Sequence, residues 1–438
     1  MLFGLHRKRS RLLKIERIVT GGDGIARFED GRIVFVPRTA PGEAIEVEYI
    51  EERSQWLRAR LVRVVEPSPF RREAPCPHYQ DCGGCQLQHL QYEAQLSIKA
   101  SIVADSLRRI GRFEIEAPEV TPSPREFAYR NRITLILRRR RGEIGFGYHA
   151  LGDPSSVVSI DRCPLAEDPL NGVLPAVSAA ALKIAGAMPR DGEWRLALRV
   201  SSEGRVGLAI EGVKRPADID RSLLAELLKS GIVAVWMVNE KGRIIAHAGE
   251  ETLAEKWDVY EVPLAGTAFV QVNRDAAAKL DDYVRSQAGV GRGTRVIDAY
   301  CGFGLRAFEL AREGADVIGI ESDRHVVRSA MVIAAERGLS VRFVAERVEN
   351  VLSKELPAEL VILNPPRGGV APDVVGALLR EPPARIIYVS CDPATLGRDL
   401  KNLSSGFTLE ACRAFDLFPQ TAHVETVVTL ARRAQDPV

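Results

Sequence analysis

The sequence predicts a multidomain protein made of a small all-β barrel, a mixed α+β central part and an α/β domain with a parallel, doubly wound sheet. Its 438 residues are enough for two to four domains of about 100–200 residues each. Short strand-like runs separated by Gly and Pro turns fill the first 72 residues, whereas strand-like and helical runs alternate from about residue 255 onward. We therefore predict domains at residues 1–72, 73–254 and 255–438.

The composition is that of a globular protein and excludes several classes. Hydrophobic residues make up 46% and charged residues 27% of the chain, which is too apolar for a mostly disordered protein. No run approaches the ~20 apolar residues of a membrane-spanning helix, and the start MLFGLHRKRSRLLKIE lacks the apolar core of a secretion signal. Seven cysteines are too few for a disulfide scaffold. We expect a cytoplasmic protein without a membrane partner.

The predicted barrel carries an excess of positive charge. Residues 1–72 contain 15 Lys and Arg against 10 Asp and Glu, a net charge of +5, whereas the whole chain nets +2. Small barrels with a basic face often bind nucleic acids, and the alternative is a solvated barrel with scattered arginines. The strand-like runs of this part are Leu12–Ile18, Ile25–Phe28, Gly31–Pro37, Ala44–Ile50 and Trp56–Val65.

The central part combines a cysteine-containing loop with helices and strands. The loop covers residues 74–89, and the apolar spacing after it predicts a helix over Tyr92–Ile110. Further helices are predicted near Pro169–Ala187 and Ile219–Leu228. The predicted strands are Arg132–Leu137, Ile144–Tyr148, Arg195–Val200, Val206–Ile210 and Val233–Asn239.

Four cysteines of the central part form a metal-binding pattern. Cys76, Cys82 and Cys85 lie close together in the sequence, and Cys163 lies far downstream. Three clustered thiolates and one remote thiolate suit an iron–sulfur cluster, whereas a structural zinc site more often uses two paired clusters. We predict an iron–sulfur cluster, with a zinc site or free thiols as alternatives.

The third part shows the βαβ alternation of a Rossmann-like sheet. Its predicted strands are Arg295–Ala299, Asp316–Ile320, Val341–Val344, Leu360–Leu363 and Arg385–Ser390, with Phe407–Leu417 and Val424–Ala431 closing the sheet. The predicted helices are Leu305–Glu313, Asp323–Arg337, Val348–Leu352, Pro372–Arg380 and Pro393–Leu403.

A glycine-rich turn predicts a nucleotide-like ligand in this part. The strand Arg295–Ala299 runs into Tyr-Cys-Gly-Phe-Gly at Tyr300–Gly304, and the next strand ends at Glu321, about 20 residues on, where a carboxylate can bind ribose hydroxyls. The third glycine of a pyrophosphate-binding turn is missing. S-Adenosylmethionine therefore fits better than NAD, and a plain turn with a surface glutamate is the alternative.

The later strands end in residues that could carry chemistry. Asn364 precedes two prolines at the carboxyl edge of the sheet, where such a group faces the base to be modified in methyltransferases. Cys391 begins a helix whose positive end can lower a thiol pKa, although a free cysteine is more often an inert core residue. Glu425 starts the last strand and could be a base, and His423 could orient a neighbour; taken alone, both are typical surface residues.

Many segments resemble one family, in order along nearly the whole chain. GGDGIARFEDGRIVFVPRTAPGEAIEVE is similar to a TRAM domain, an RNA-binding barrel, and CPHYQDCGGCQLQHLQYEAQLSIK resembles a cluster loop with its helix. YRNRI, GFGYH, AFVQVN, DAYCGFG, NPPRGG, YVSCDPATLGRDL and FPQTAHVET follow. The family is that of the iron–sulfur-containing RNA 5-methyluridine methyltransferases of the RumA/TrmA type.

The resemblance implies a TRAM-like barrel, a central domain with an iron–sulfur loop and a class I methyltransferase domain. It implies S-adenosylmethionine and a [4Fe-4S] cluster as cofactors, RNA as the partner, and a monomer. Cys391 would be the nucleophile and Glu425 the general base. Residues that would contact S-adenosylmethionine or the uracil are Gln271, Tyr300, Glu321 and Asn364. The cluster ligands would be Cys76, Cys82, Cys85 and Cys163.

The chemistry of uracil methylation agrees with these roles. A thiolate that adds to carbon 6 makes carbon 5 nucleophilic, and a carboxylate must later remove the proton from carbon 5. The target uridine must be flipped out of its helix or lie in a loop.

Three positions depart from the family pattern: Asn364 and Asp392 stand where the family usually has Asp and Asn, and Leu305 stands where it has Thr. NPP motifs also resemble those of amino-group methyltransferases, but these need no catalytic cysteine, so Cys391 together with Glu425 favours uracil. We predict an active enzyme that forms 5-methyluridine in 23S rRNA. The alternatives are the same reaction on tRNA and an RNA-binding family member without catalysis.

Overall fold

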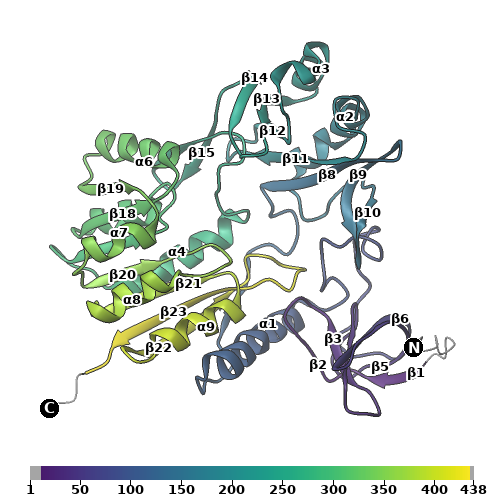
Figure 1. Cartoon of the computed structure of the whole chain (residues 1–438), viewed down its shortest axis with the longest axis horizontal. Coiled ribbons are helices and arrows are strands. Elements are labelled where there is room, and N and C mark those ends of the chain that lie inside the picture. The colour runs from purple at the N-terminus through teal and green to yellow at the C-terminus, as the bar shows by residue number, and fades with distance from the viewer. Residues whose placement is uncertain (1–10, 435–438) are drawn as a thin grey trace.

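The computed structural model describes residues 11–434 (Figure 1). The predictions that concern residues 1–10, which include the beginning of the predicted barrel and of the stretch considered as a secretion signal, lie outside the described residues. Within residues 11–434, no helix has both the length and the apolar character that crossing a membrane requires.

The first sheet contains the strands predicted from the alternating pattern. Its strand order is β1-β5-β6-β4-β3-β2, and all neighbours pair antiparallel except β4 and β6. Ile45 and Val47 alternate with more exposed residues along β5 and share a core with Val34 and Val36 of β4. The bounds are β1 Arg11–Lys14, β2 Arg17–Ile18, β3 Gly24–Arg27, β4 Ile33–Val36, β5 Ala44–Glu52 and β6 Trp56–Glu66.

The central sheet has the order β10-β9-β8-β11-β12-β13-β14, and helices α2 and α3 pack on it through a shared apolar core. The sequence did not predict β10 and β14, because both are edge strands whose side chains are largely exposed and therefore lack a strong apolar pattern. The strands are β8 Arg132–Arg140, β9 Glu143–Ala150, β10 Asp153–Val158, β11 Gly192–Val200, β12 Val206–Glu211, β13 Ile232–Val238 and β14 Ile244–Gly249. The helices are α2 Asp168–Ala185, a short 3-10 turn at Pro216–Asp218, and α3 Arg221–Lys229.

Two further unpredicted elements connect the central sheet to the last one. The hairpin of β15 (Leu253–Trp257) and β16 (Tyr260–Leu264) begins two residues before the predicted boundary at residue 255. Helix α4 (Arg274–Ala288) follows, capped by the side chain of Asn273. Its buried stripe consists mainly of alanines, which give a weak apolar signal in the sequence. The domain boundaries at 72 and 254 stay predictions.

The predicted doubly wound sheet is confirmed. Its strand order is β19-β18-β17-β20-β21-β23-β22-β7, with parallel pairing from β19 to β21 and antiparallel pairing of β23 with both neighbours. Helices α4 and α5 pack on one face, and α7, α8 and α9 pack on the other. The strands are β17 Arg295–Ala299, β18 Asp316–Glu321, β19 Val341–Ala345, β20 Leu360–Leu363, β21 Arg385–Ser390, β22 Phe407–Phe415 and β23 Glu425–Arg432. The helices are α5 Leu305–Arg312, α6 Arg324–Glu336, α7 Val348–Glu355, α8 Pro372–Arg380 and α9 Pro393–Leu403.

An early segment of the chain completes this late sheet. Helix α1 (Tyr92–Ser106), extended by a π-helical turn at Leu107–Gly111, packs Val103 and Leu107 into the core that also contains α9. Strand β7 (Val120–Thr121) pairs in parallel with β22 at the edge. Figure 1 shows α1 lying beside α9 and between the first sheet and the last. The predicted central part therefore contributes directly to the last sheet.

Candidate active site

The carboxyl edge of the eight-stranded sheet collects candidate residues from adjacent strands. Strand β18 ends at Glu321, and Tyr300, Asn364 and Cys391 directly follow β17, β20 and β21. These strands are parallel neighbours in the order β18-β17-β20-β21. Residues that end parallel neighbours lie at one edge of a sheet, which is where such folds bind ligands.

The turn after β17 is tied to the end of β18. The backbone N–H of Gly302 donates to Oε2 of Glu321 (3.2 Å), while Oε1 of Glu321 accepts from the N–H of Asp323 (2.9 Å). Gly302 has a φ of 55°, and a Cβ placed there would meet no atom within 4 Å. The turn thus leaves open space beside a half-buried carboxylate, which is the arrangement a ribose-bearing ligand requires.

Asn364 lies at this edge, whereas Gln271 is hydrogen-bonded to a different part of the chain. The N–H of Asn364 donates to the carbonyl of Ala299 (3.3 Å), which fixes Asn364 next to the start of the glycine-rich turn. Gln271 lies between the β15–β16 hairpin and α4, and its carbonyl accepts from Nδ2 of Asn131 (2.9 Å). Within residues 11–434, this hydrogen bond links Gln271 to Asn131, which directly precedes β8.

Cys391 and Glu425 are brought together across two antiparallel strands. Ser390 of β21 pairs with Thr426 of β23, so Cys391 follows one partner and Glu425 precedes the other at the same edge. Glu425 is only 5% exposed, and Cys391 is half-buried. His423 is exposed, as expected of a surface residue, whereas Glu425 is buried and is not a surface residue.

The pKa of Cys391 corrects one expectation. Burial raises the pKa of this thiol above its ordinary value of 9.0, and the nearby Glu425 carboxylate raises it further, while Arg367 opposes both effects. The net shift of this pKa is therefore upward, although Cys391 stands at the amino terminus of α9. Asp392 caps that helix, since its carboxylate accepts from the N–H of Thr395 (2.8 Å) and places a negative charge beside the thiol.

Glu425 has the ionisation behaviour of a base. Burial raises the pKa of its carboxyl from 4.5 to about 7, against the opposing charges of Arg306 and Arg367. A carboxyl group whose pKa lies near neutrality can accept a proton and release it again at physiological pH.

A buried polar stripe on α1 holds the loop that leads to Glu425, and it was not among the residues predicted from the sequence. Lys99 is 0% exposed and donates through Nζ to Asp416 (2.5 Å) and to the carbonyl of Phe418 (3.0 Å). Gln95 is also 0% exposed and bonds to Gln420 of the same loop. The sequence feature that could have predicted this stripe is the spacing of Gln95 and Lys99, which stand one helical turn apart among apolar residues.

The loop with the candidate cluster cysteines Cys76, Cys82 and Cys85 is held by the first sheet. The guanidinium of Arg38 donates to the carbonyls of Tyr79 (2.7 Å), Cys82 (2.8 Å) and Cys85, and it stacks on the Tyr79 ring at 3.5 Å from the centroid. Arg38 follows β4, so a fixed cation orders the carbonyls of a loop that lies far along the chain.

The thiols of Cys76, Cys82 and Cys85 are close enough to Cys163 to be affected by its charge. Burial is the largest effect that raises the pKa values of Cys76, Cys82 and Cys85, and the proximity of Cys163 raises all three further. Even so, no group of three or more Cys, His, Asp and Glu side chains within residues 11–434 is arranged to hold a metal ion.

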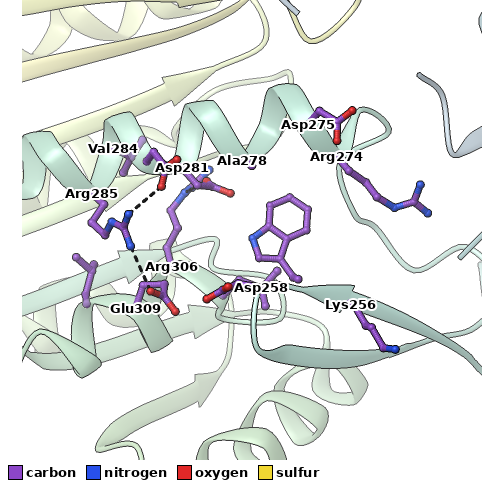
Figure 2. Close-up of a pocket in the computed structure, with 14 residues that line it drawn as sticks. Lys256, Asp258, Arg274, Asp275, Ala278, Asp281, Val284, Arg285, Arg306 and Glu309 are labelled. Carbon is purple, nitrogen blue, oxygen red and sulfur yellow. Dashed lines mark hydrogen bonds and ion pairs between the residues drawn. The ribbon is translucent and has the colours of Figure 1, made fainter. Parts of the chain in front are cut away.

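A separate cavity lies away from these candidates. It has a volume of about 500 Å³ between α4, α5 and the β15–β16 hairpin (Figure 2). Asp281 and Arg285 of α4 face Arg306 and Glu309 of α5 across it, with Arg306 bound to Asp281 at 2.7 Å. Of the residues singled out from the sequence, only Leu305 lines it. The cavity is therefore not the predicted cofactor site.

Comparisons with known proteins identify the family. The tRNA (Uracil-5-)-methyltransferase family model matches residues 249–433, and the TRAM domain model matches residues 9–62. The chain is 34% identical to the 23S rRNA (uracil(1939)-C(5))-methyltransferase RlmD of Pseudomonas entomophila, over 96% of this chain and 93% of the relative. The protein of the same name from Shewanella amazonensis is 31% identical over 94% of both chains.

The chain belongs to the RNA uracil-5-methyltransferase family. The chain is also similar over almost its whole length to a solved structure, that of Pyrococcus abyssi tRNA (uracil-54, C5)-methyltransferase in complex with S-adenosyl-L-homocysteine. It has a TM-score of 0.74, is 26% identical, and the match covers 98% of this chain and 100% of that one. The TRAM domain and the class I methyltransferase fold expected from the sequence are confirmed, as is the reaction: methylation of carbon 5 of an RNA uridine with S-adenosylmethionine.

Proposed function

We propose that this methyltransferase modifies a uridine of 23S rRNA through a covalent bond between Cys391 and carbon 6 of the uracil. The observation that carries the proposal is the pairing of β21 with β23, which sets Cys391 and the buried Glu425 side by side at the ligand edge. Covalent catalysis of this reaction needs one nucleophile and one base close to the same ring.

The residues of the edge divide the reaction into steps. The Cys391 thiolate adds to carbon 6, and the electron density that this creates makes carbon 5 nucleophilic. Arg367 favours the thiolate, since its charge opposes the rise in the pKa of Cys391 that burial and Glu425 cause. After carbon 5 has gained its methyl group, Glu425 takes the proton from that carbon, and the bond from carbon 6 to sulfur breaks.

Bound S-adenosylmethionine supplies the methyl group. The open turn at Gly302 and the adjacent carboxylate of Glu321 fit its ribose. We assign Tyr300, Asn364 and Gln271 to contacts with the cofactor or the uracil. Asn364 offers an amide donor in place of the carboxylate usual in the resembling family, which suits a carbonyl oxygen of uracil.

The choice of 23S rRNA rests on the relatives. Those named as 23S rRNA enzymes are 31% and 34% identical, whereas the solved structure named as a tRNA enzyme is 26% identical. The TRAM domain, in a first part that nets +5, would bind the RNA backbone around the target. Transfer RNA is the second candidate substrate. We also propose that the enzyme is a monomer. Its domains would cover residues 1–72, 73–254 and 255–438.

The purified enzyme should form 5-methyluridine in 23S rRNA that was isolated from cells lacking this enzyme. Mass-spectrometric mapping of 23S rRNA and tRNA after incubation with S-adenosylmethionine measures the site directly. Modification of tRNA alone would replace the rRNA assignment. No 5-methyluridine in either RNA would contradict the proposed reaction on both substrates.

We further propose that Cys76, Cys82, Cys85 and Cys163 hold a [4Fe-4S] cluster. The proximity of Cys163, which adds to the rise that burial causes in the pKa values of Cys76, Cys82 and Cys85, supports it, as does the N–H of Gly84, which donates to the Cys82 sulfur (3.4 Å). Three cysteines close together in the sequence and one remote cysteine suit an iron–sulfur cluster, whereas a structural zinc site more often uses two paired clusters. The cluster would brace the loop, since the methylation chemistry needs no electron transfer.

Protein purified without oxygen should show visible absorbance and contain iron, and Cys82→Ala should lose both. We expect this variant to melt at a lower temperature and to bind RNA less tightly, because the loop loses its brace. Cys412→Ala, which replaces a half-buried cysteine of β22, is the matched control and should keep the iron. A colourless, iron-free wild-type protein would refute the cluster.

A further inference from the structure

Gln420 is the most heavily bonded residue of the loop between β22 and β23. Its side chain is 0% exposed, and its φ of 71° lies in the left-handed region that residues other than glycine rarely adopt. Its N–H donates to Oε1 of Gln95 (2.9 Å), and its carbonyl accepts from the N–H groups of Gln86 (3.1 Å) and Leu87 (2.9 Å). The backbone of Gln420 therefore connects α1 and the cysteine loop.

The side-chain amide of Gln420 is bonded at both ends. Its Oε1 accepts from Nε2 of Gln95 (2.9 Å) and from Nη2 of Arg72 (3.0 Å), while its Nε2 donates to Oε2 of Glu126 (3.2 Å). Only a group that accepts on one side and donates on the other satisfies this set, because Arg72 has only donors and an ionised Glu126 has only acceptors. The site therefore requires an amide at position 420.

The remaining contacts of the loop restrain it on both sides of Gln420. Tyr129 donates through its hydroxyl to the carbonyl of Pro419 (3.0 Å), and the N–H of Ala422 donates to Oε1 of Gln86 (3.4 Å). Glu425 stands five residues after Gln420 and begins β23. The position of Glu425 is therefore set from one end by the strand register and from the other by this buried bond network.

We propose that Gln420 is a positioning residue for proton removal: its amide fixes the loop so that the Glu425 carboxylate meets the proton on carbon 5 of the methylated adduct. The inference rests on the proposed role of Glu425 as the base. In that step the proton goes to Glu425 and the electron pair of the C–H bond forms the double bond between carbons 5 and 6. The bond from carbon 6 to sulfur breaks, and its electrons return to the Cys391 thiolate.

The step is isolated by comparing three RNA substrates that carry uridine, 5-deuterouridine or 5-fluorouridine at the target position. Fluorine cannot leave as a proton, so 5-fluorouridine reports only the addition of Cys391 and the methyl transfer. Deuterium slows only the removal of the proton. A defect in positioning Glu425 should therefore appear with uridine and deuterouridine and be absent with fluorouridine.

Gln420→Glu sets a carboxylate against Glu126 and should displace the loop. We expect kcat for uridine to fall about 10- to 100-fold with little change in KM, and kcat to become sensitive to deuterium. The rate of adduct formation with 5-fluorouridine should stay that of wild type. Glu126→Gln combined with Gln420→Glu exchanges the amide and the carboxylate, so the double variant should recover kcat. Gln91→Ala, which removes an exposed glutamine at the start of α1, is the control.

Two results would overturn the inference: equal losses with uridine and 5-fluorouridine, or no recovery in the double variant. Should Gln420→Glu fail to fold, Glu126→Gln alone gives the same readout from outside the loop, and an unchanged isotope effect there counts against the proposal. The variant Glu425→Gln distinguishes a failure of the proposed base from a failure of the proposed positioning residue. Normal turnover in Glu425→Gln refutes the base itself, whereas a stalled Glu425→Gln with a normal Gln420→Glu refutes only the positioning role.

Discussion

Cys391→Ala should abolish methylation and leave RNA binding intact. We expect kcat to fall at least about 10⁴-fold, since the covalent route disappears with its nucleophile. The variant should also form no denaturation-resistant adduct with RNA that carries 5-fluorouridine, which gel electrophoresis under denaturing conditions detects. Binding of the unmodified RNA should stay close to that of wild type, because the TRAM domain is unchanged.

Cys301→Ala is the matched control for this experiment. Cys301 lies in the glycine-rich turn at the same edge, and burial holds its pKa well above the ordinary value, so its thiol should not react. We expect this variant to keep adduct formation. An adduct that survives in Cys391→Ala but is lost in Cys301→Ala would move the nucleophile to the turn.

Glu425→Gln should trap the enzyme on ordinary RNA. Cys391 can still add and the methyl group can still be transferred, but the proton on carbon 5 finds no base, so a covalent complex with uridine RNA should accumulate. Turnover should fall about 10²- to 10⁴-fold, the usual contribution of general base catalysis. Denaturing gels and mass spectrometry of the trapped complex, which should carry one extra methyl group, measure the outcome.

The pH dependence provides the control for Glu425. A base must be ionised to act, and burial raises the pKa of this carboxyl to about 7, so wild-type kcat should rise as the pH increases through about 7. Asp392→Asn also removes a carboxylate near Cys391 but leaves Glu425 in place, so it should keep that rise. A wild-type rate that is flat between pH 6 and 8 would contradict the assignment of Glu425.

The sequence was sufficient to predict where the candidate residues lie because strand ends are easy to recognise. Apolar runs such as Leu360–Leu363 and Arg385–Ser390 mark buried parallel strands, and whatever follows them must lie at the carboxyl edge. The order of residues along the chain was therefore enough to place Asn364 and Cys391 at that edge.

The chemical environment of these groups could not be predicted in the same way. The pKa of Cys391 is raised and not lowered, because burial raises it and because the carboxylates of Glu425 on the neighbouring strand and Asp392 at the start of α9 lie close to the thiol. These effects depend on which side chains face each other, and the linear pattern does not contain that information. The sequence did not predict helix α4 for a different reason. Its buried face consists mainly of alanines, which give only a weak apolar pattern.

The packing of α1 and β7 on the last sheet also bears on how the chain folds. Val103 and Leu107 cover a core whose other members reach Leu430, and β7 pairs with a strand from the far end of the chain. Contacts over such separations form slowly, because a long loop must close before they stabilise anything. During synthesis α1 emerges well before the carboxyl-terminal strands, so its buried Lys99 can bind Asp416 only after those strands have been made. The order of synthesis and the order of assembly are therefore opposed in this protein, and the methyltransferase sheet is complete only when both halves of the chain are present.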